Sequence, residues 1–270
     1  MLHMVVCVKQ VPDTTEVRID PRTNTLVRAG VPAVINPYDA HAVEAAVQLK
    51  EKYGGRVTAL SMGPPQAEEV LRRALAMGAD EGILLTDRAF AGSDTLATSY
   101  ILAQAIKKID KMLPVNLVLC GKQAIDGDTA QVGPGIATRL GFTQLTYCMA
   151  IDILDLERGY IQVQRKLEGK REIVRGRLPA LLTVVKEINE LRYASLPALV
   201  RAARADIITW GKDDLELDPA QIGLKGSPTS VWRIFAPPAR PGGEIIPGKP
   251  QEAAAALVEK LVKTKVVADR

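Results

Sequence analysis

The amino-acid sequence predicts an α/β protein with a parallel sheet, an antiparallel addition and a C-terminal arm. Three observations support this class. Up to about residue 143, short β-branched runs alternate with amphipathic helical patterns. Beyond that point, strand candidates follow one another closely, with glycines between them. Finally, residues 219–250 hold seven of the 17 prolines, a density that excludes a packed helix or a central strand there.

The first half contains four expected strands. They lie at 3–10, 56–63, 81–85 and 115–120. Helical patterns occupy 36–55, 64–78 and 93–110, and a short hairpin is expected at 17–30 around Pro21–Asn24. Strands that alternate with helices form right-handed crossovers and therefore a parallel sheet. The carboxyl ends of such strands gather at one edge, where these sheets bind ligands.

Capping residues mark the expected ends of these helices. Asp39 is expected to be the N-cap of the first helix, and Gly54 to end it. Gly78 is expected to end the second helix, and Ser93 or Asp94 to cap the third.

In the second half, the alternation of strand and helix patterns gives way to closely spaced strand candidates. Strand candidates at 145–156, 160–169, 170–178 and 180–187 indicate the antiparallel addition. A short helix is expected at 195–206, with Ser195 as its cap and Pro197 near its first position. The proline-rich arm then leads to a last helix at 250–264. A long arm without secondary structure is unusual inside a monomer, so we expect it to cross the surface of a partner subunit.

Composition limits the possible functions. Aromatic residues make up only 4% of the chain, and the net charge is a mild +4 without a dense basic block, so we expect no nucleic-acid partner. No run of about 18 apolar residues predicts a membrane span. The start of the chain does not resemble a signal peptide, and the three cysteines are widely spaced, which together favour a cytoplasmic protein.

Several catalytic signatures are absent from the sequence. We find no P-loop, GxGxxG, GxSxG or HExxH pattern, and no CxxC pair. With only His3 and His41 available, a histidine-centred triad or zinc site is not expected. We therefore expect neither catalytic residues nor a resident metal.

The stretch GKQAIDGDTAQVGPGIATRL, at 121–140, follows the fourth strand and allows three interpretations. Asp126 and Asp128 offer two carboxylates to a divalent cation. Alternatively, Asp128 and Gln131 form a capping box, with Gly127 in a positive-φ turn, which we favour over the metal. The same geometry also presents N–H groups to a phosphate. Pro134 either marks the start of the next helix or kinks its first turns.

Two other stretches each have a structural and a functional interpretation. In INPYDAH, Asn36 either completes a turn before a helix, which we favour, or binds an adenine edge together with the Tyr38 backbone. In LRYASLPALV, Leu196 either faces the core or forms an exposed apolar plug beside Arg201 and Arg204, suited to a pocket on a partner.

These motifs together resemble the β subunit of electron-transfer flavoproteins. The resemblance covers VCVKQVPD, INPYDAHAVEAAVQLKE, LSMGPPQAEEVLRRALAMGAD, LVLCGKQAIDGDTAQVGPGIATRL and LRYASLPALVRA, in family order. It implies a Rossmann-like sheet of the adenine-nucleotide α-hydrolase kind, at 1–206, with a partner-docking loop near 190–204. It also implies a heterodimer with an α subunit that carries FAD, and the extended arm and helix of 207–270 would pack on that subunit.

The resemblance further implies the ligand. Conventional members hold a structural AMP in the β subunit, whereas electron-bifurcating members hold a second FAD that takes a hydride from NADH. The segment DGDTAQVGP is similar to that of bifurcating members, so FAD is expected, with AMP as the alternative. Electrons would then pass to ferredoxin or flavodoxin and, through the α-subunit FAD, to an acyl-CoA-type dehydrogenase or a quinone-linked partner. Such NADH oxidation would belong to the αβ complex only.

The residues that match the family motifs form two groups. The expected cofactor-binding residues are Cys7, Asn36, Pro37, Tyr38, Asp39, Met62, Gly121, Gln123, Asp126, Gly127, Asp128, Thr129, Ala130, Gln131, Val132, Gly133 and Pro134. The expected partner-docking residues are Tyr193, Leu196 and Pro197. A nucleotide-binding regulatory module, stable as a homodimer, remains the alternative from a different functional class.

Overall fold

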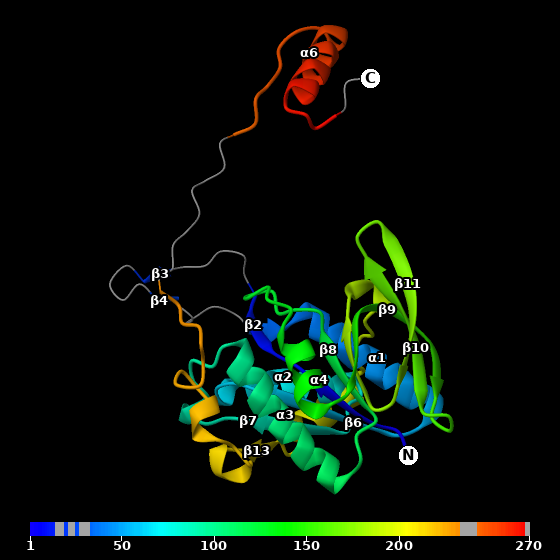
Figure 1. Cartoon of the computed structure of the whole chain (residues 1–270), viewed down its shortest axis with the longest axis vertical. Coiled ribbons are helices and arrows are strands. Elements are labelled where there is room, and N and C mark those ends of the chain that lie inside the picture. The colour runs from blue at the N-terminus through cyan, green and yellow to red at the C-terminus, as the bar shows by residue number, and fades with distance from the viewer. Residues whose placement is uncertain (14–18, 21–24, 27–32, 233–241, 268–270) are drawn as a thin grey trace. The chain divides into compact units, whose positions relative to one another are not determined.

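Six parallel strands form the centre of the protein, and the sheet continues beyond them on one side (Figure 1). The computed structural model describes residues 1–13, 19–20, 25–26, 33–232 and 242–267. Within this part of the chain, one nine-stranded sheet has the order β11-β10-β9-β12-β8-β1-β6-β7-β13. Its parallel strands are β1 (His3–Cys7), β6 (Arg56–Met62), β7 (Glu81–Leu85), β8 (Leu117–Gly121), β12 (Ala180–Val184) and β13 (Ile208–Trp210). The predicted α/β class with a parallel sheet is confirmed.

The antiparallel addition consists of three long strands at one edge. These are β9 (Thr143–Asp155), β10 (Tyr160–Leu167) and β11 (Lys170–Arg177), and Figure 1 shows them extending beyond the sheet. β10 pairs antiparallel with both neighbours, whereas β9 runs parallel to β12. The run at 180–187 was expected in this addition, but as β12 it lies inside the parallel sheet. Its five residues are all buried, as is usual for a strand covered on both faces.

Helices cover both faces of the sheet and create two separate cores. Helices α1 (Pro37–Tyr53) and α2 (Glu68–Met77) pack on one face, with Met4 and Val6 of β1. Helices α3 (Thr95–Met112) and α4 (Val132–Leu140) pack on the other, with Val5 and Cys7. This alternation is the period-two pattern of a strand buried on both sides.

Most of the predicted helix ends are confirmed. Gly54 and Gly78 follow the last residues of α1 and α2, and both have positive φ. The Asp94 carboxylate accepts hydrogen bonds from the N–H groups of the first turn of α3. Ser195 caps α5 (Leu196–Arg204), its hydroxyl accepting from Ala198 N–H at 3.4 Å.

Small elements lie outside the main sheet. β2 (Gln10–Pro12) pairs with β5 (Ala33–Ile35), and β3 (Ile19–Asp20) pairs antiparallel with β4 (Thr25–Leu26). The pairing of β3 with β4 agrees with the hairpin expected at 17–30, whereas its turn at Pro21–Asn24 lies outside the described residues. Single turns of 3₁₀ helix occur at Pro65–Ala67, Arg88–Phe90, Lys186–Ile188, Lys212–Asp214 and Pro219–Gln221.

The C-terminal region differs from the expected boundary after residue 206. The chain divides into the units Met1–Ile234 and Phe235–Arg270. β13 extends the sheet beside β7, and the following residues remain attached to the first unit, since Tyr100 accepts from Asp218 N–H at 2.9 Å. A three-residue strand gives too short a pattern to be recognised in the sequence. In the second unit, α6 (Pro250–Lys263) forms as expected, with Leu257 and Val258 exposed.

The helices of the described residues are too short or too polar to cross a membrane.

The close approach of α4 to β12 allows the packing between these two elements to be tested. A Cβ atom on Gly133 would lie 2.6 Å from Cγ2 of Thr183, whereas one on Gly127 would meet nothing within 4 Å. We predict that Gly133→Ala lowers the free energy of unfolding by about 1–3 kcal/mol, because the crowded core must shift. Gly127→Ala is the control and should stay within about 0.5 kcal/mol of wild type. Urea unfolding of both variants measures this, and equal stabilities would contradict the predicted contact.

Candidate functional site

A topological switch point lies between β1 and β8. From β1 the chain proceeds through α1 to β6 and through α2 to β7, on one side of β1. It then returns through α3, on the opposite face, to β8 on the other side of β1. The loops that follow β1 and β8 therefore diverge and leave a crevice at the carboxyl edge, which is where open α/β sheets bind ligands.

The buried carboxylate of Asp39 spans this crevice. One oxygen accepts a hydrogen bond from Lys9 N–H at 2.8 Å, and the other accepts from Gly121 N–H at 3.0 Å. The expected N-cap role of Asp39 is therefore wrong. Asn36 occupies the N-cap position, without a side-chain capping bond. Asp39 lies in the first turn of α1, and its carboxylate accepts from N–H groups at the ends of two strands and not from those of its own helix.

A glycine at 121 is a requirement of this contact. A Cβ atom there would lie 2.4 Å from Oδ1 of Asp39 and 2.6 Å from Cβ of Tyr38. Both distances are shorter than any stable contact. The first residue of α1 and the end of β8 can approach each other only because this side chain is absent.

The surroundings of Asp39 also change its protonation. Burial raises its pKa to about 7, although hydrogen bonds from Asn36, Lys9 and Gly121 and the Lys9 charge act in the opposite direction. A group of this kind titrates near neutral pH while holding two loops together.

Asn36 links the same two loops through other atoms. Its backbone N–H donates to the Lys9 carbonyl at 2.8 Å. Its side-chain amide donates to the Gln123 carbonyl at 2.9 Å, and its side-chain oxygen accepts from Ile125 N–H at 3.2 Å. The favoured structural interpretation of Asn36 agrees with this geometry, because both ends of its amide already have partners in the protein.

The two aspartates of the loop after β8 point to different partners. Asp126 pairs with the Lys9 ammonium, with oxygens at 2.7 and 2.8 Å. Asp128 accepts from the Gln123 amide at 2.5 Å. In the described part of the chain, no three Asp, Glu, His or Cys side chains are grouped as metal ligands. The arrangement therefore gives no support to the metal interpretation of this loop.

The capping-box interpretation is also wrong. α4 begins at Val132, and Gln131 is its N-cap without a side-chain capping bond, because its amide oxygen accepts from Thr95 hydroxyl at 3.0 Å. Pro134 lies in the first turn of α4, where its missing N–H has no helical partner to lose. Residues 122–131 therefore form a long loop before the helix, which is the first of the two alternatives for Pro134.

Left-handed backbone in this loop occurs at two non-glycine residues. Asp128 has φ of 52° and Ala130 has φ of 55°, whereas Gly127, where positive φ was expected, is not left-handed. Such residues are uncommon and each cost about 1–3 kcal/mol, so the surrounding structure must hold them. Ala130 precedes Gln131 in right-handed conformation, an alternation that turns successive N–H groups to one side.

Those N–H groups are available to a ligand. Among the described residues, the backbone N–H groups of Thr129, Ala130 and Gln131 have no hydrogen-bond acceptor. They lie immediately before α4, whose N-terminus adds a partial positive charge. The loop is thus suited to bind an anion such as a phosphate.

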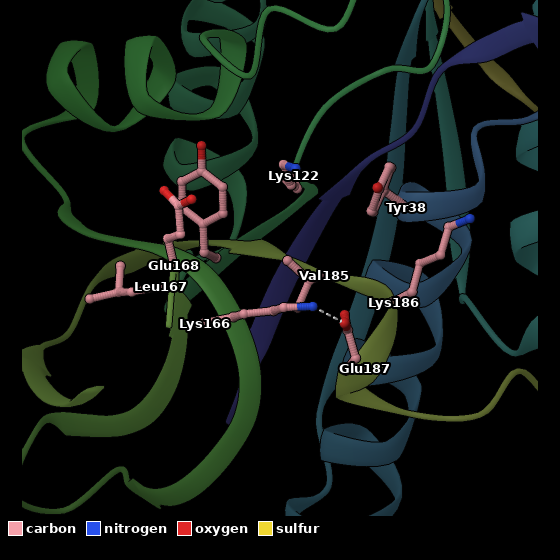
Figure 2. Close-up of a pocket in the computed structure, with 9 residues that line it drawn as sticks. Tyr38, Lys122, Lys166, Leu167, Glu168, Val185, Lys186 and Glu187 are labelled. Atoms are coloured by element: carbon pink, nitrogen blue, oxygen red, sulfur yellow. Dashed lines mark hydrogen bonds and ion pairs between the residues drawn. The ribbon is translucent and has the colours of Figure 1, made fainter. Parts of the chain in front are cut away.

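A neighbouring cavity extends the site along the carboxyl edge (Figure 2). Its volume is about 330 Å³. The residues that line it are Tyr38, Lys122, Tyr147, Lys166, Leu167, Glu168, Val185, Lys186 and Glu187. Tyr38 and Lys122 directly adjoin Asp39 and Gly121 in the chain. The cavity therefore begins where the crevice ends.

Cations and aromatic rings face each other in this cavity. The Lys122 ammonium lies 5.9 Å from the ring centre of Tyr38 and 5.5 Å from that of Tyr147. Lys186 lies 5.4 Å from the Tyr38 ring, whereas Lys166 pairs with Glu187, as Figure 2 shows. Positive charge beside an aromatic face suits a ligand that has both a planar ring and an anionic group.

Tyr147 has an unusual backbone. Its φ of 58° is rare for a bulky residue, and it occurs where the pairing of β9 with β12 shifts register. The Thr183 hydroxyl accepts from Tyr147 N–H at 3.1 Å and holds this irregularity. Lys9, Lys122, Tyr147 and Lys186 were missed from the sequence. Only the position of Lys122, between the predicted Gly121 and Gln123, offered a signal.

Cys7 and Met62 lie at the carboxyl ends of β1 and β6, as their positions in the sequence predicted. Cys7 is paired in register with Cys120 of β8, and both side chains are buried. A hydrogen bond with Cys7, together with burial, raises the pKa of the Cys120 thiol well above its usual value. The Cys120 thiol therefore stays protonated and acts as a packing group.

The predicted docking residues lie apart from the crevice, on the segment that leads into α5. Tyr193 is 98% exposed and Leu196 is 74% exposed, and Leu199 and Val200 are also exposed. Leu196 therefore does not face the core. Together these four side chains form an apolar surface, which we call the docking ridge. Such a surface indicates an interaction site.

The protonation of Asp39 gives a pH-dependent prediction. Its folded pKa of about 7 exceeds the ordinary aspartate value of 3.8, so its contribution to stability is present at low pH and is lost as pH rises towards about 7. Asp39→Asn removes this titration and leaves one N–H without its acceptor. At about pH 5 the variant should be less stable by about 1–3 kcal/mol. That deficit should shrink by about 2 kcal/mol by about pH 8. Urea unfolding of both proteins across this range measures it, and a pH-independent deficit would contradict it.

Comparison with known proteins assigns the family. The electron transfer flavoprotein domain model matches residues 23–215. Protein FixA of Bradyrhizobium diazoefficiens is 50% identical over 96% of this chain and 91% of its own length. The electron transfer flavoprotein subunit beta of Clostridium acetobutylicum is 49% identical, over 96% and 98% respectively. The caffeyl-CoA reductase-Etf complex subunit CarD of Acetobacterium woodii is 50% identical, over 98% and 100%. This chain therefore belongs to the electron transfer flavoprotein family, among its β subunits.

Proposed function

We propose that this chain is the β subunit of a heterodimeric electron-transfer flavoprotein that binds FAD in the crevice and receives electrons from NADH. The observation that carries this proposal is the loop before α4, whose N–H groups at 129–131 have no acceptor among the described residues. The same loop begins at Lys122, which lines a cavity with further lysines and tyrosine rings. The alternative is a conventional β subunit that holds a structural AMP in the same crevice.

The residues of the crevice are compatible with a nucleotide diphosphate. Asn36 and Asp39 hold the two loops at a fixed separation, and Gly121 lets the first turn of α1 pack against the end of β8. The N–H groups of Thr129, Ala130 and Gln131 would bind the phosphates, assisted by the α4 N-terminus. Of the two loop carboxylates, Lys9 neutralises Asp126, and Asp128 accepts a hydrogen bond from the Gln123 amide.

The cavity supports FAD over AMP. A mononucleotide needs only the crevice and the loop before α4, whereas a dinucleotide with a second ring system needs further space. The cavity beside Tyr38 and Lys122 supplies that space, together with rings for stacking and a cation for an electron-rich ring. The proposal thus places Tyr38 and Lys122 beside the flavin ring.

The protein's own contribution is binding, orientation and electrostatics. FAD, when bound, would accept the two electrons of an NADH hydride and release them singly, one to ferredoxin or flavodoxin and one towards the FAD of the α subunit. Lys122 and Lys186 place two positive charges beside the Tyr38 ring. These positive charges would favour the binding of a ring that carries negative charge. Neither step requires a catalytic acid or base from this chain.

Two surfaces support the proposed partners. The exposed apolar side of α6, with Leu257 and Val258, is suited to pack against an α subunit. The docking ridge is suited to a flavin-containing dehydrogenase of the acyl-CoA type. The name of the A. woodii relative, a subunit of a caffeyl-CoA reductase-Etf complex, supports this class of partner for the present chain.

Cofactor content tests the choice of ligand. We predict that the purified αβ complex contains two FAD per heterodimer and no stoichiometric AMP, as measured by extraction and chromatography. NADH should bleach one flavin rapidly in a stopped-flow experiment. One FAD with one AMP, and no reaction with NADH, would instead establish the conventional alternative. A stable nucleotide-bound homodimer without an α subunit would overturn both.

The docking ridge gives a separate prediction. Leu196→Ala should reduce kcat/KM for electron exchange with an acyl-CoA dehydrogenase by about tenfold, since truncating an exposed apolar anchor removes interface burial of more than about 1 kcal/mol. Flavin content should remain that of wild type. Leu191→Ala, which removes a similar exposed side chain just before the ridge, is the matched control. An unchanged rate in a folded Leu196→Ala complex would remove this residue from the interface.

A further inference from the structure

The segment that carries the docking ridge makes few apolar contacts of its own. Tyr193 and Leu196 point into solvent, and within α5 only Ala202 is buried. A short helix with one buried residue has little packing to fix its position. Its position must therefore depend on polar contacts at its two ends.

Arg192 makes most of these contacts, directly before Tyr193. Its guanidinium bonds Glu44 through Nε at 2.8 Å and through a terminal nitrogen at 3.0 Å. It also bonds both oxygens of Glu51, at 2.6 and 3.0 Å. Both glutamates belong to α1, two turns apart. Bidentate hydrogen bonds of this kind fix the orientation of the guanidinium as well as its distance from the carboxylates.

We call the contacts of Arg192 with Glu44 and Glu51 the clamp. Burial makes the clamp stronger than an ordinary surface ion pair. The Glu44 side chain is only 3% exposed and that of Arg192 is 30% exposed. The hydrogen bonds that Arg192 donates to Glu51 and Glu44 raise its pKa, so its charge is permanent. An exposed pair contributes little, but a buried carboxylate needs its partner. The contact between Glu44 and Arg192 therefore holds the start of the ridge against α1.

Two further contacts hold the same segment. Before Arg192, the Asn189 amide donates to the His41 carbonyl at 3.0 Å, and its oxygen lies 2.8 Å from Nδ1 of His41. At the other end, Arg72 of α2 donates to the carbonyls of Ala202 and Ala205, at 2.7 and 3.1 Å. These are carbonyls at the end of α5, which a cation stabilises.

We propose that Arg192 is a positioning residue that holds the docking ridge in the conformation that binds a partner. The proposal rests on the proposed function of the ridge, and it adds the device that orders it. The partner surface that fits is an apolar pocket with acidic groups at its rim, because Arg201 and Arg204 are exposed next to Leu199 and Val200 on α5. A ridge that is already ordered loses less freedom when it binds.

The experiment uses the αβ complex with substitutions in the clamp. Arg192→Gln and Glu51→Gln each remove clamp contacts, and Glu51→Gln does so without leaving a buried charge, since that side chain is 56% exposed. Arg56→Gln is the control, because it removes an ion pair with Glu81 and none with the ridge segment. Arg192→Lys tests for partial rescue by a residue that keeps the charge but lacks the planar fork.

Two measurements are made on each complex. Amide hydrogen exchange of residues 189–204 reports the order of the segment. Steady-state electron exchange with an acyl-CoA dehydrogenase gives KM and kcat. We expect faster exchange in this segment and a KM raised about tenfold for Arg192→Gln, as a tenfold smaller competent population requires, with kcat unchanged. Glu51→Gln and Arg192→Lys should lie between wild type and Arg192→Gln, and Arg56→Gln should match wild type.

The outcomes separate this proposal from the proposed function. Unchanged hydrogen exchange, or faster exchange with an unchanged KM, would overturn the positioning role of Arg192. If Arg56→Gln raised KM equally, the effect would be general destabilisation, and the proposal would also fail. If Leu196→Ala left KM unchanged, the docking function of the ridge would fail, whereas the exchange data would still decide whether Arg192 orders the segment.

Discussion

The buried carboxylate of Asp39 is the contact on which the ligand site depends. In a doubly wound sheet, the loops that leave β1 and β8 diverge, and no strand pairing holds them together beyond the last residues of the sheet. Asp39 gives one oxygen to each loop, through Lys9 N–H and Gly121 N–H. Asn36, at the start of the same helix, repeats the connection with other atoms. The first turn of α1 therefore sets the width of the crevice.

The conformation of the loop before α4 follows from that support. Left-handed backbone at Asp128 and Ala130 is unfavourable by about 1–3 kcal/mol at each residue, so an unsupported loop would relax. Gln123 holds Asp128, and Lys9 holds Asp126, both from within the framework that Asn36 and Asp39 create. The strain is thus maintained by residues of the two loops that follow β1 and β8. Its result is a row of N–H groups without acceptors, ready before any anion arrives.

Local patterns predicted the fold well, and contacts between distant residues explain what they missed. The strands, the glycine stops and the caps at Asp94 and Ser195 follow from periodicity and from neighbours within one helical turn. Asp39 also looked like a cap, but its partners lie 30 and 82 residues away, at positions that only the folded sheet brings together. The motif at 121–140 was correctly placed at the carboxyl edge of the sheet, after β8. The cavity was not predicted, because Tyr147 reaches it through an irregularity in β9 that has no sequence signature.

Helix α1 connects the two functional surfaces. Its N-terminus closes the crevice through Asn36 and Asp39, and the side chains of Glu44 and Glu51 further along hold the segment that carries the docking ridge. Hydrophobic packing alone does not explain this role of α1. A buried glutamate such as Glu44 is energetically costly unless it has a charged partner. Its burial is understandable once Arg192 is included. The helix that packs on the central strands thereby holds both the loops of the proposed ligand site and the segment that carries the docking ridge.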